Sequence, residues 1–111
     1  MTDQPVLMQV DPRGIARITL NRPGVHNAFD DDLIARLGEL LGELEGQRGL
    51  RALVLAATGR SFSAGADLNW MRRMADYSES ENRADALKLA ELMSRLNRLP
   101  VPTIARVQGP A

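Results

Sequence analysis

The sequence has no cysteine, a single histidine and no long apolar run. Without cysteine no disulfide framework can form, and His26 alone cannot build a Cys/His zinc site, so no metal is expected. No stretch approaches the roughly 18 consecutive apolar residues that span a bilayer. Residues 1–5 show no basic segment leading into an apolar one, so no signal peptide is predicted. We therefore expect a cytoplasmic protein with no membrane partner.

An excess of charge of one sign is also missing. Fourteen Lys and Arg residues balance fourteen Asp and Glu residues, which makes the formal net charge zero. Nucleic-acid-binding domains normally carry a basic excess or stripe, so no nucleic-acid partner is expected. The chain has no G-x-G-x-x-G after a strand, no Walker-A loop and no nucleophile elbow. These absences argue against dinucleotide, nucleotide-triphosphate and serine-hydrolase chemistry.

What the sequence does contain is enough apolar material to fold. With 44% hydrophobic and 25% charged residues in 111, it is predicted to form one small domain or a piece of a larger one. Strand and helix patterns alternate, which indicates an α/β fold with a mixed sheet flanked by helices. The predicted elements are strands at 6–10, 15–20, 52–57 and 103–107, and helices at 33–44, from about 67, and at 80–99.

The clearest pattern is the helix at 33–44, whose leucines and isoleucine recur at helical spacing. Asp30, Asp31 and Asp32 stand at its start, where carboxylates accept free backbone N–H groups. Gly38 and Gly42 are four residues apart, a spacing that would let another group pack closely against the helix. The glutamates at 39, 43 and 45 lie on its polar side and are interpreted as a solvated face rather than as acid–base groups.

The segment most informative about function lies at 61–70, between the strand at 52–57 and the next helix. Its small residues would let a ligand come close to the main chain, and amides at a helix start are unpartnered. Such amides could bind a carbonyl oxygen on which negative charge develops. A tight turn that needs Gly65 for steric reasons alone is the alternative, and the residues by themselves leave both open.

Three stretches together resemble one family. Phe-Ser-Ala-Gly-Ala-Asp-Leu at 62–68 looks like the signature of the crotonase, or enoyl-CoA hydratase/isomerase, family. Asn-Arg-Pro at 21–23 followed by Asn-Ala at 27–28 resembles its first motif. Pro-x-Pro-Thr-Ile-Ala at 100–105, followed by Gly-x-Ala at 109–111, resembles the approach to its third. Residues 67–71 further resemble the branch that hydrates glutaconyl-type thioesters, including methylglutaconyl-CoA hydratase.

The resemblance implies a spiral of ββα repeats, assembled into homotrimers or paired trimers. It implies an acyl-CoA thioester substrate, with coenzyme A as part of that substrate and no separate cofactor. Ala66 matches the residue whose backbone N–H forms half of an oxyanion hole, which makes it the candidate catalytic residue. His26 matches a position that touches the pantetheine or phosphate, although a plain loop histidine is the alternative. The coenzyme A-binding segment is matched by Ala64, Gly65, Ala66, Asp67 and Leu68.

Members of this family continue into a glycine run that supplies the second oxyanion N–H, and then to catalytic glutamates. Residues 1–111 are therefore expected to form the N-terminal part of one crotonase-like domain. We expect the isolated chain to hydrate enoyl-CoA no faster than buffer and to self-associate. The implied reaction of the whole protein is hydration of a 2-enoyl-CoA. A family isomerase, or a non-catalytic module that binds coenzyme A or assists assembly, stays open as an alternative.

Trp70, Met71 and Met74 follow directly after the carbonyl-binding candidate. They could line a pocket for the acyl chain. The alternative, which we favour, is a short helix whose apolar side packs into the core.

Overall fold

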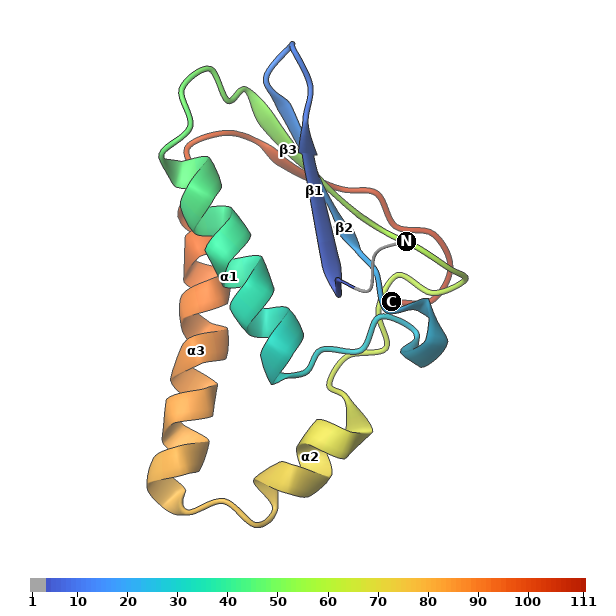
Figure 1. Cartoon of the computed structure of the whole chain (residues 1–111), viewed down its shortest axis with the longest axis vertical. Coiled ribbons are helices and arrows are strands. Elements are labelled where there is room, and N and C mark those ends of the chain that lie inside the picture. Colours follow the sequence, from blue (N-terminus) through green and yellow to red (C-terminus); the bar gives the residue numbers. More distant parts are fainter. Residues whose placement is uncertain (1–3) are drawn as a thin grey trace.

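Four strands form the mixed sheet of this computed structural model, which describes residues 4–111 (Figure 1). In order across the sheet they are β1 (Val6–Val10), β2 (Ile15–Leu20), β3 (Ala52–Ala57) and β4 (Thr103–Ala105). β1 and β2 pair antiparallel, whereas β2–β3 and β3–β4 are parallel. The predicted α/β organisation is confirmed. The domain predicted over 1–111 begins with residues 1–3, which lie outside the described residues.

The β1–β2 hairpin closes through a turn that only glycine fits well. Gly14 has φ of +85°, and its N–H donates to the Asp11 carbonyl at 3.0 Å. A β-carbon at Gly14 would clash with the Gly49 carbonyl oxygen. The Arg51 N–H donates to the Gly14 carbonyl at 2.8 Å, so this turn also positions the entry to β3. The predicted hairpin is therefore correct, and its turn connects to the central strand.

The first long helix is α1 (Asp31–Glu45), and its predicted apolar stripe is entirely buried. Asp30 caps it by accepting the Leu33 N–H at 2.9 Å. Arg95 crosses this face and donates to the Gly38 carbonyl at 3.2 Å. A β-carbon would meet no atom within 4 Å at Gly38 and only the Arg95 guanidinium, at 3.4 Å, at Gly42, so the predicted close packing against these glycines is not found in the described residues. The buried stripe consists of Leu33, Ile34, Leu37, Leu40, Leu41 and Leu44.

The second long helix, α3 (Glu79–Arg98), lies beside α1 on the same face of the sheet (Figure 1). It begins slightly before the predicted Ser80, because Ser78 and Glu81 form a capping box at its start. Leu92 is the only buried residue within it, and Leu99 is buried just after its end. Met93 is 45% exposed, so its predicted place on the buried face was wrong.

Two short helices lie near the segments of functional interest. The helix predicted from about 67 is α2 (Leu68–Met74), with Asp67 as its N-cap, and η1 (Pro23–Val25) is a 3-10 turn that was not predicted. Trp70 is buried in the core and Met74 packs against it, as favoured over an acyl-pocket role. Met71 is 48% exposed and therefore does not pack in the core of the described residues.

The parallel part of the sheet differs from the sequence prediction in two respects. β3 was expected to be covered on both faces. Leu53 is buried, but the next residue, Val54, whose side chain lies on the other face of the sheet, is only partly buried in the described structure. β4 ends at Ala105 rather than residue 107, after which the Gln108 amide donates to the Ala57 and Gly59 carbonyls at 3.0 Å each. The C-terminal residues thus run beside the loop that follows β3. Within residues 4–111, no helix is both long and apolar enough to cross a membrane.

Candidate functional site

Residues 22–29 and 58–67, called the paired segments below, lie against each other beyond the ends of β2 and β3. Asn27 joins them from a fully buried position with φ of +55°. Its Oδ1 accepts the Arg22 N–H at 2.7 Å, and its Nδ2 donates to the carbonyls of Thr58 (2.8 Å) and Ser61 (2.9 Å). Every polar atom of this amide group is therefore engaged, as buried polar groups require.

A single parallel bridge between Phe29 and Ala66 sets the direction of one backbone amide. The Phe29 N–H donates to the Gly65 carbonyl at 2.6 Å, and the Asp67 N–H donates to the Phe29 carbonyl at 2.7 Å. In such a bridge the neighbours of Ala66 face the partner, while its own N–H faces the opposite side. No acceptor within residues 4–111 receives the Ala66 N–H. The amides of Ala64 and Gly65, by contrast, are already bonded to the His26 carbonyl and the Ser63 hydroxyl.

A cleft of about 480 Å³ is lined by Ala66 and by residues of both paired segments. Five of the six residues predicted from sequence line it: His26, Ala64, Ala66, Asp67 and Leu68. Gly65 does not line it, since its carbonyl is turned to Phe29. Four further lining residues were not predicted: Val25, Ala28, Asn69 and Arg72. The i, i+4 spacing of Leu68 and Arg72 on one helix was the available sequence signal.

Gly65 is required by its backbone conformation rather than by crowding. Its φ is +88°, and a β-carbon placed on it would meet no atom within 4 Å. Crowding by other residues therefore does not explain this glycine, but a tight turn that needs glycine, the alternative raised from the sequence, does. The left-handed conformation, which costs a non-glycine residue about 1–2 kcal/mol, makes the bend that leads into the bridge.

Asp67 is the one acidic residue lining the cleft, and both of its carboxylate oxygens are engaged. Oδ1 accepts the Trp70 N–H at 3.0 Å, and Oδ2 lies 3.2 Å from the Arg22 guanidinium. The Trp70 backbone N–H, together with Arg22, holds the pKa of Asp67 below its ordinary value despite the opposing effect of burial. Asp67 is therefore an ionised helix cap rather than a free acid or base.

His26 lines the cleft from the loop after η1, in the left-handed conformation with φ of +53°. Its Nδ1 lies 3.1 Å from the Ser61 hydroxyl, and its carbonyl accepts the Ala64 N–H at 2.9 Å. His26 therefore links the paired segments through both ring and backbone. Its contact with a ligand stays a prediction.

Comparison with known proteins identifies the family. The model of the enoyl-CoA hydratase/isomerase family matches residues 11–111, which is nearly the whole chain. The chain belongs to this enoyl-CoA hydratase/isomerase family. A solved enoyl-CoA hydratase from Shewanella pealeana superposes with a TM-score of 0.91 and 42% identity, covering 95% of this chain and 39% of that one. This match confirms the crotonase-like α/β fold that the sequence motifs implied.

Named relatives in the family differ in reaction. A Thermus thermophilus protein named as a candidate enoyl-CoA hydratase is 37% identical over 95% of this chain and 42% of its own length. The 1,2-epoxyphenylacetyl-CoA isomerase of Escherichia coli is 36% identical over 89% of this chain and 38% of its own. The chain thus spans about two fifths of the length of these curated relatives. Hydratase and isomerase names both occur at similar identity.

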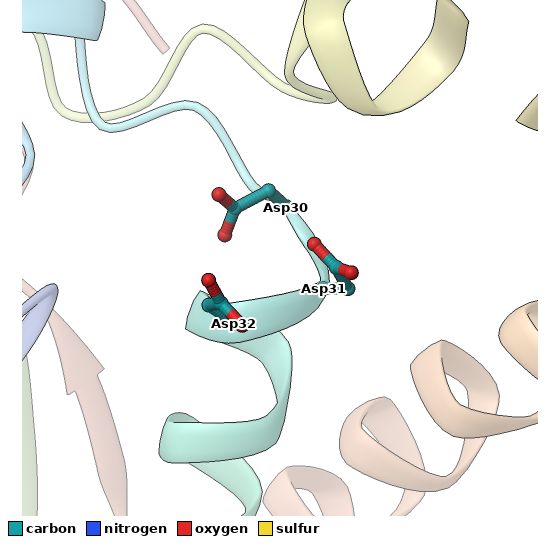
Figure 2. Close-up of side chains that lie close together, drawn as sticks. All are labelled: Asp30, Asp31 and Asp32. Carbon is teal, nitrogen blue, oxygen red and sulfur yellow. The ribbon is translucent and has the colours of Figure 1, made fainter. Parts of the chain in front are cut away.

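Three consecutive aspartates of this hydratase/isomerase-family chain gather at the start of α1 (Figure 2). Asp30 caps the helix and lies 3.3 Å from Arg22, while Asp31 pairs with Arg73 of α2 at 2.9 Å. Carboxylates at a helix N-terminus are stabilised by the helix dipole without any metal ion. Capping and ion pairing account for Asp30 and Asp31, and we assign the cluster no metal-binding role.

Proposed function

We propose that this chain forms the thioester-binding part of an acyl-CoA enzyme, in which the Ala66 N–H donates to the thioester carbonyl oxygen. The observation that carries the proposal is the unpartnered Ala66 amide beside a cleft, held there by the Phe29 bridge. The small residues Ala28 and Ala64 line the same cleft, so an acyl-CoA could approach the main chain. We propose that residues 64–68 and His26 contact the coenzyme A portion.

The proposed reaction is hydration of a 2-enoyl-CoA. A water oxygen bonds to C3, the C2–C3 double bond breaks, and its electrons form an enolate whose charge lies on the thioester oxygen. The attacking water loses one proton as its oxygen bonds to C3, and one proton adds to C2, so that the elements of water add across the former double bond. A hydrogen bond to that oxygen strengthens as charge develops, and one such donor is typically worth about 2.7–4 kcal/mol of barrier. Because Asp67 is already engaged, we propose that the described part of the cleft polarises the thioester and does not activate water.

Two finer assignments belong to the same proposal. The first is a glutaconyl-type substrate such as methylglutaconyl-CoA, supported by the resemblance of residues 67–71 to that branch. The second is assembly of the whole protein into trimers or paired trimers. A double-bond isomerase is the second candidate function, favoured by the isomerase name of the Escherichia coli relative. Incubation in H₂¹⁸O separates the two, because hydration places ¹⁸O on C3 and isomerisation moves the double bond without it.

The deciding experiment removes the donor itself. In the whole protein, Ala66→Pro deletes the N–H, while Ala66→Ser keeps it at the same position. Ala66 lies before α2, which begins only at Leu68, so the proline removes no helical hydrogen bond. We expect kcat for Ala66→Pro to fall about 10²–10³-fold with a near-normal circular dichroism spectrum, and Ala66→Ser to stay close to wild type. Full activity of a folded Ala66→Pro variant would rule out the proposed donor.

The alternative of a non-catalytic module is tested with residues 1–111 alone. Calorimetry with free coenzyme A and with a saturated acyl-CoA shows whether the described cleft binds either ligand. We expect no hydration above the buffer rate from this chain, because a single donor does not supply the acid–base steps. Turnover by purified 1–111 would contradict this expectation.

A further inference from the structure

Arg22 contacts three groups with one guanidinium. Its Nη1 donates to the Ala28 carbonyl at 2.5 Å. Its other terminal nitrogen lies 3.2 Å from the Asp67 carboxylate and 3.3 Å from the Asp30 carboxylate. The side chains are largely buried, with exposed fractions of 21% for Arg22, 16% for Asp30 and 8% for Asp67. Such a partly desolvated, shared ion pair differs from the exposed pairs elsewhere on this surface.

These three partners lie on both sides of the bridge that exposes the Ala66 amide. Ala28 and Asp30 are the residues immediately before and after Phe29, and Asp67 immediately follows Ala66. Arg22 therefore connects both strands of a bridge that has only two backbone hydrogen bonds of its own. Both carboxylates are also N-caps, Asp30 for α1 and Asp67 for α2, so the same cation links two helix starts.

We infer that Arg22 is a positioning residue for the thioester site, holding the Phe29 and Ala66 segments in register so that the Ala66 N–H keeps its direction toward the cleft. This inference rests on the proposed function of that amide. Without the guanidinium, Asp30 and Asp67 would stand close together as two poorly hydrated like charges, and their repulsion would act directly across the bridge. A donor turned away from the thioester oxygen loses its effect on the enolate even while the substrate stays bound.

The test compares Arg22→Gln and Arg22→Lys in the whole protein with Arg73→Gln as the matched control. Arg73 also pairs with an aspartate at the start of α1, at 2.9 Å, but its pair is exposed and its residues do not line the cleft. The direct readout is the carbonyl stretching frequency of bound butyryl-CoA carrying a ¹³C label at the thioester carbon. Steady-state kcat and KM and the thermal midpoint are measured on the same proteins.

In the wild type we expect the bound carbonyl to absorb at lower frequency than free butyryl-CoA, because a hydrogen bond weakens the C=O bond. Arg22→Gln should lose most of that shift and about 10–10²-fold in kcat, with KM nearly unchanged. Arg22→Lys, which keeps the charge but not the planar fork, should recover part of both. Arg73→Gln should retain the full shift and kcat.

Three outcomes separate the two ideas. A full carbonyl shift and normal kcat in folded Arg22→Gln would overturn the inference and leave the proposed function intact. A loss of kcat that matches only the fraction of unfolded protein would likewise reduce Arg22 to a stabilising role. No shift in the wild type would overturn the proposed function itself. If Arg22→Gln does not fold, Arg22→Lys decides the question: it keeps the charge between Asp30 and Asp67 but not the planar fork, so part of the carbonyl shift and of kcat should be lost, and full wild-type values would overturn the inference.

Discussion

The layer between α1 and the sheet and the paired segments are neighbours, but different forces hold them. In the layer, residues such as Ile18, Leu41 and Leu53 are fully buried and gain their stability from apolar burial, which has no direction. In the paired segments, Asn27 and Arg22 make directional bonds to specific oxygens. The difference suggests that changes in the first region alter stability, whereas changes in the second alter geometry and therefore function.

In the apolar layer we expect a large loss of stability without a change in the chemistry of the site. Leu41→Ala removes a fully buried side chain and should lower the free energy of unfolding by about 2–5 kcal/mol. Urea denaturation of the whole protein measures the change, with Leu87→Ala, 62% exposed, as a control expected to stay within about 0.5 kcal/mol. The folded fraction of Leu41→Ala should keep normal KM and carbonyl polarisation. A selective loss of kcat in Leu41→Ala would break the comparison.

A change at Asn27, by contrast, should lower both the stability and the kcat of the folded protein. Asn27→Ala leaves the Arg22 N–H and the Thr58 and Ser61 carbonyls without their partner, and each unsatisfied buried group costs about 1–3 kcal/mol. We expect kcat of the folded fraction to fall as well. Asn27→Gly is the matched control, since glycine adopts a φ of +55° without strain but loses the same side-chain hydrogen bonds. It therefore separates the effect of the lost bonds from that of backbone strain. Normal kcat in both variants would show that the amide of Asn27 has no role in the site.

Two glycines with open space around them sharpen the comparison at a smaller scale. A β-carbon at Gly38 or Gly65 would meet no atom within 4 Å, but Gly38 lies inside α1 and Gly65 has φ of +88°. Gly38→Ala should therefore raise the free energy of unfolding by about 0.5–1 kcal/mol. Gly65→Ala should lower it by about 1–2 kcal/mol. Thermal unfolding measures both changes. If the two substitutions changed the free energy of unfolding in the same direction, backbone conformation would not be the cause.

The smallest effect concerns pH. The pKa of Asp67 is lowered from 3.8, chiefly by the Trp70 N–H. A carboxyl with a lowered folded-state pKa contributes stability above its unfolded pKa, and that contribution is lost as pH falls through the folded value. The stability advantage of wild type over Asp67→Asn should therefore shrink as pH drops below 3.8. Denaturation midpoints measured from about pH 5 to about pH 2 would test this. Parallel curves for the two proteins would contradict it.

Much of the framework followed from local patterns. The spacing of the apolar residues in α1 predicts which side of the helix is buried. The turn at Gly14 predicts the β1–β2 hairpin, and the apolar run at 52–57 predicts β3. For α3 the sequence predicted the helix but not which of its side chains are buried. Of its 20 residues Leu92 is buried, because burial depends on which other elements pack against the helix. Met93 illustrates this, since its spacing suits the buried face while the described fold leaves it exposed.

The candidate site likewise contains some features that local sequence predicts and others that it does not. Small residues before a new helix were enough to single out the segment at 61–70, because their sizes and the unpaired amides of a helix start are local properties. Ala66 itself was named by the resemblance of residues 62–68 to the family signature. Arg72 was missed, although it stands four residues after the predicted Leu68 and so on the same side of α2. The link from Arg22 to Asp67 was missed as well, because 45 positions separate these residues.

The sequence by itself therefore determined most of the helices and strands, the turn at Gly14 and the small-residue segment, since these depend on side-chain size and on torsions within a few residues. Only the tertiary structure decided that Phe29 pairs with Ala66 and that Arg22 connects both strands of that bridge. The physical reason is that the direction of an amide is set by what its neighbours bind, and those partners meet only when distant segments pack together.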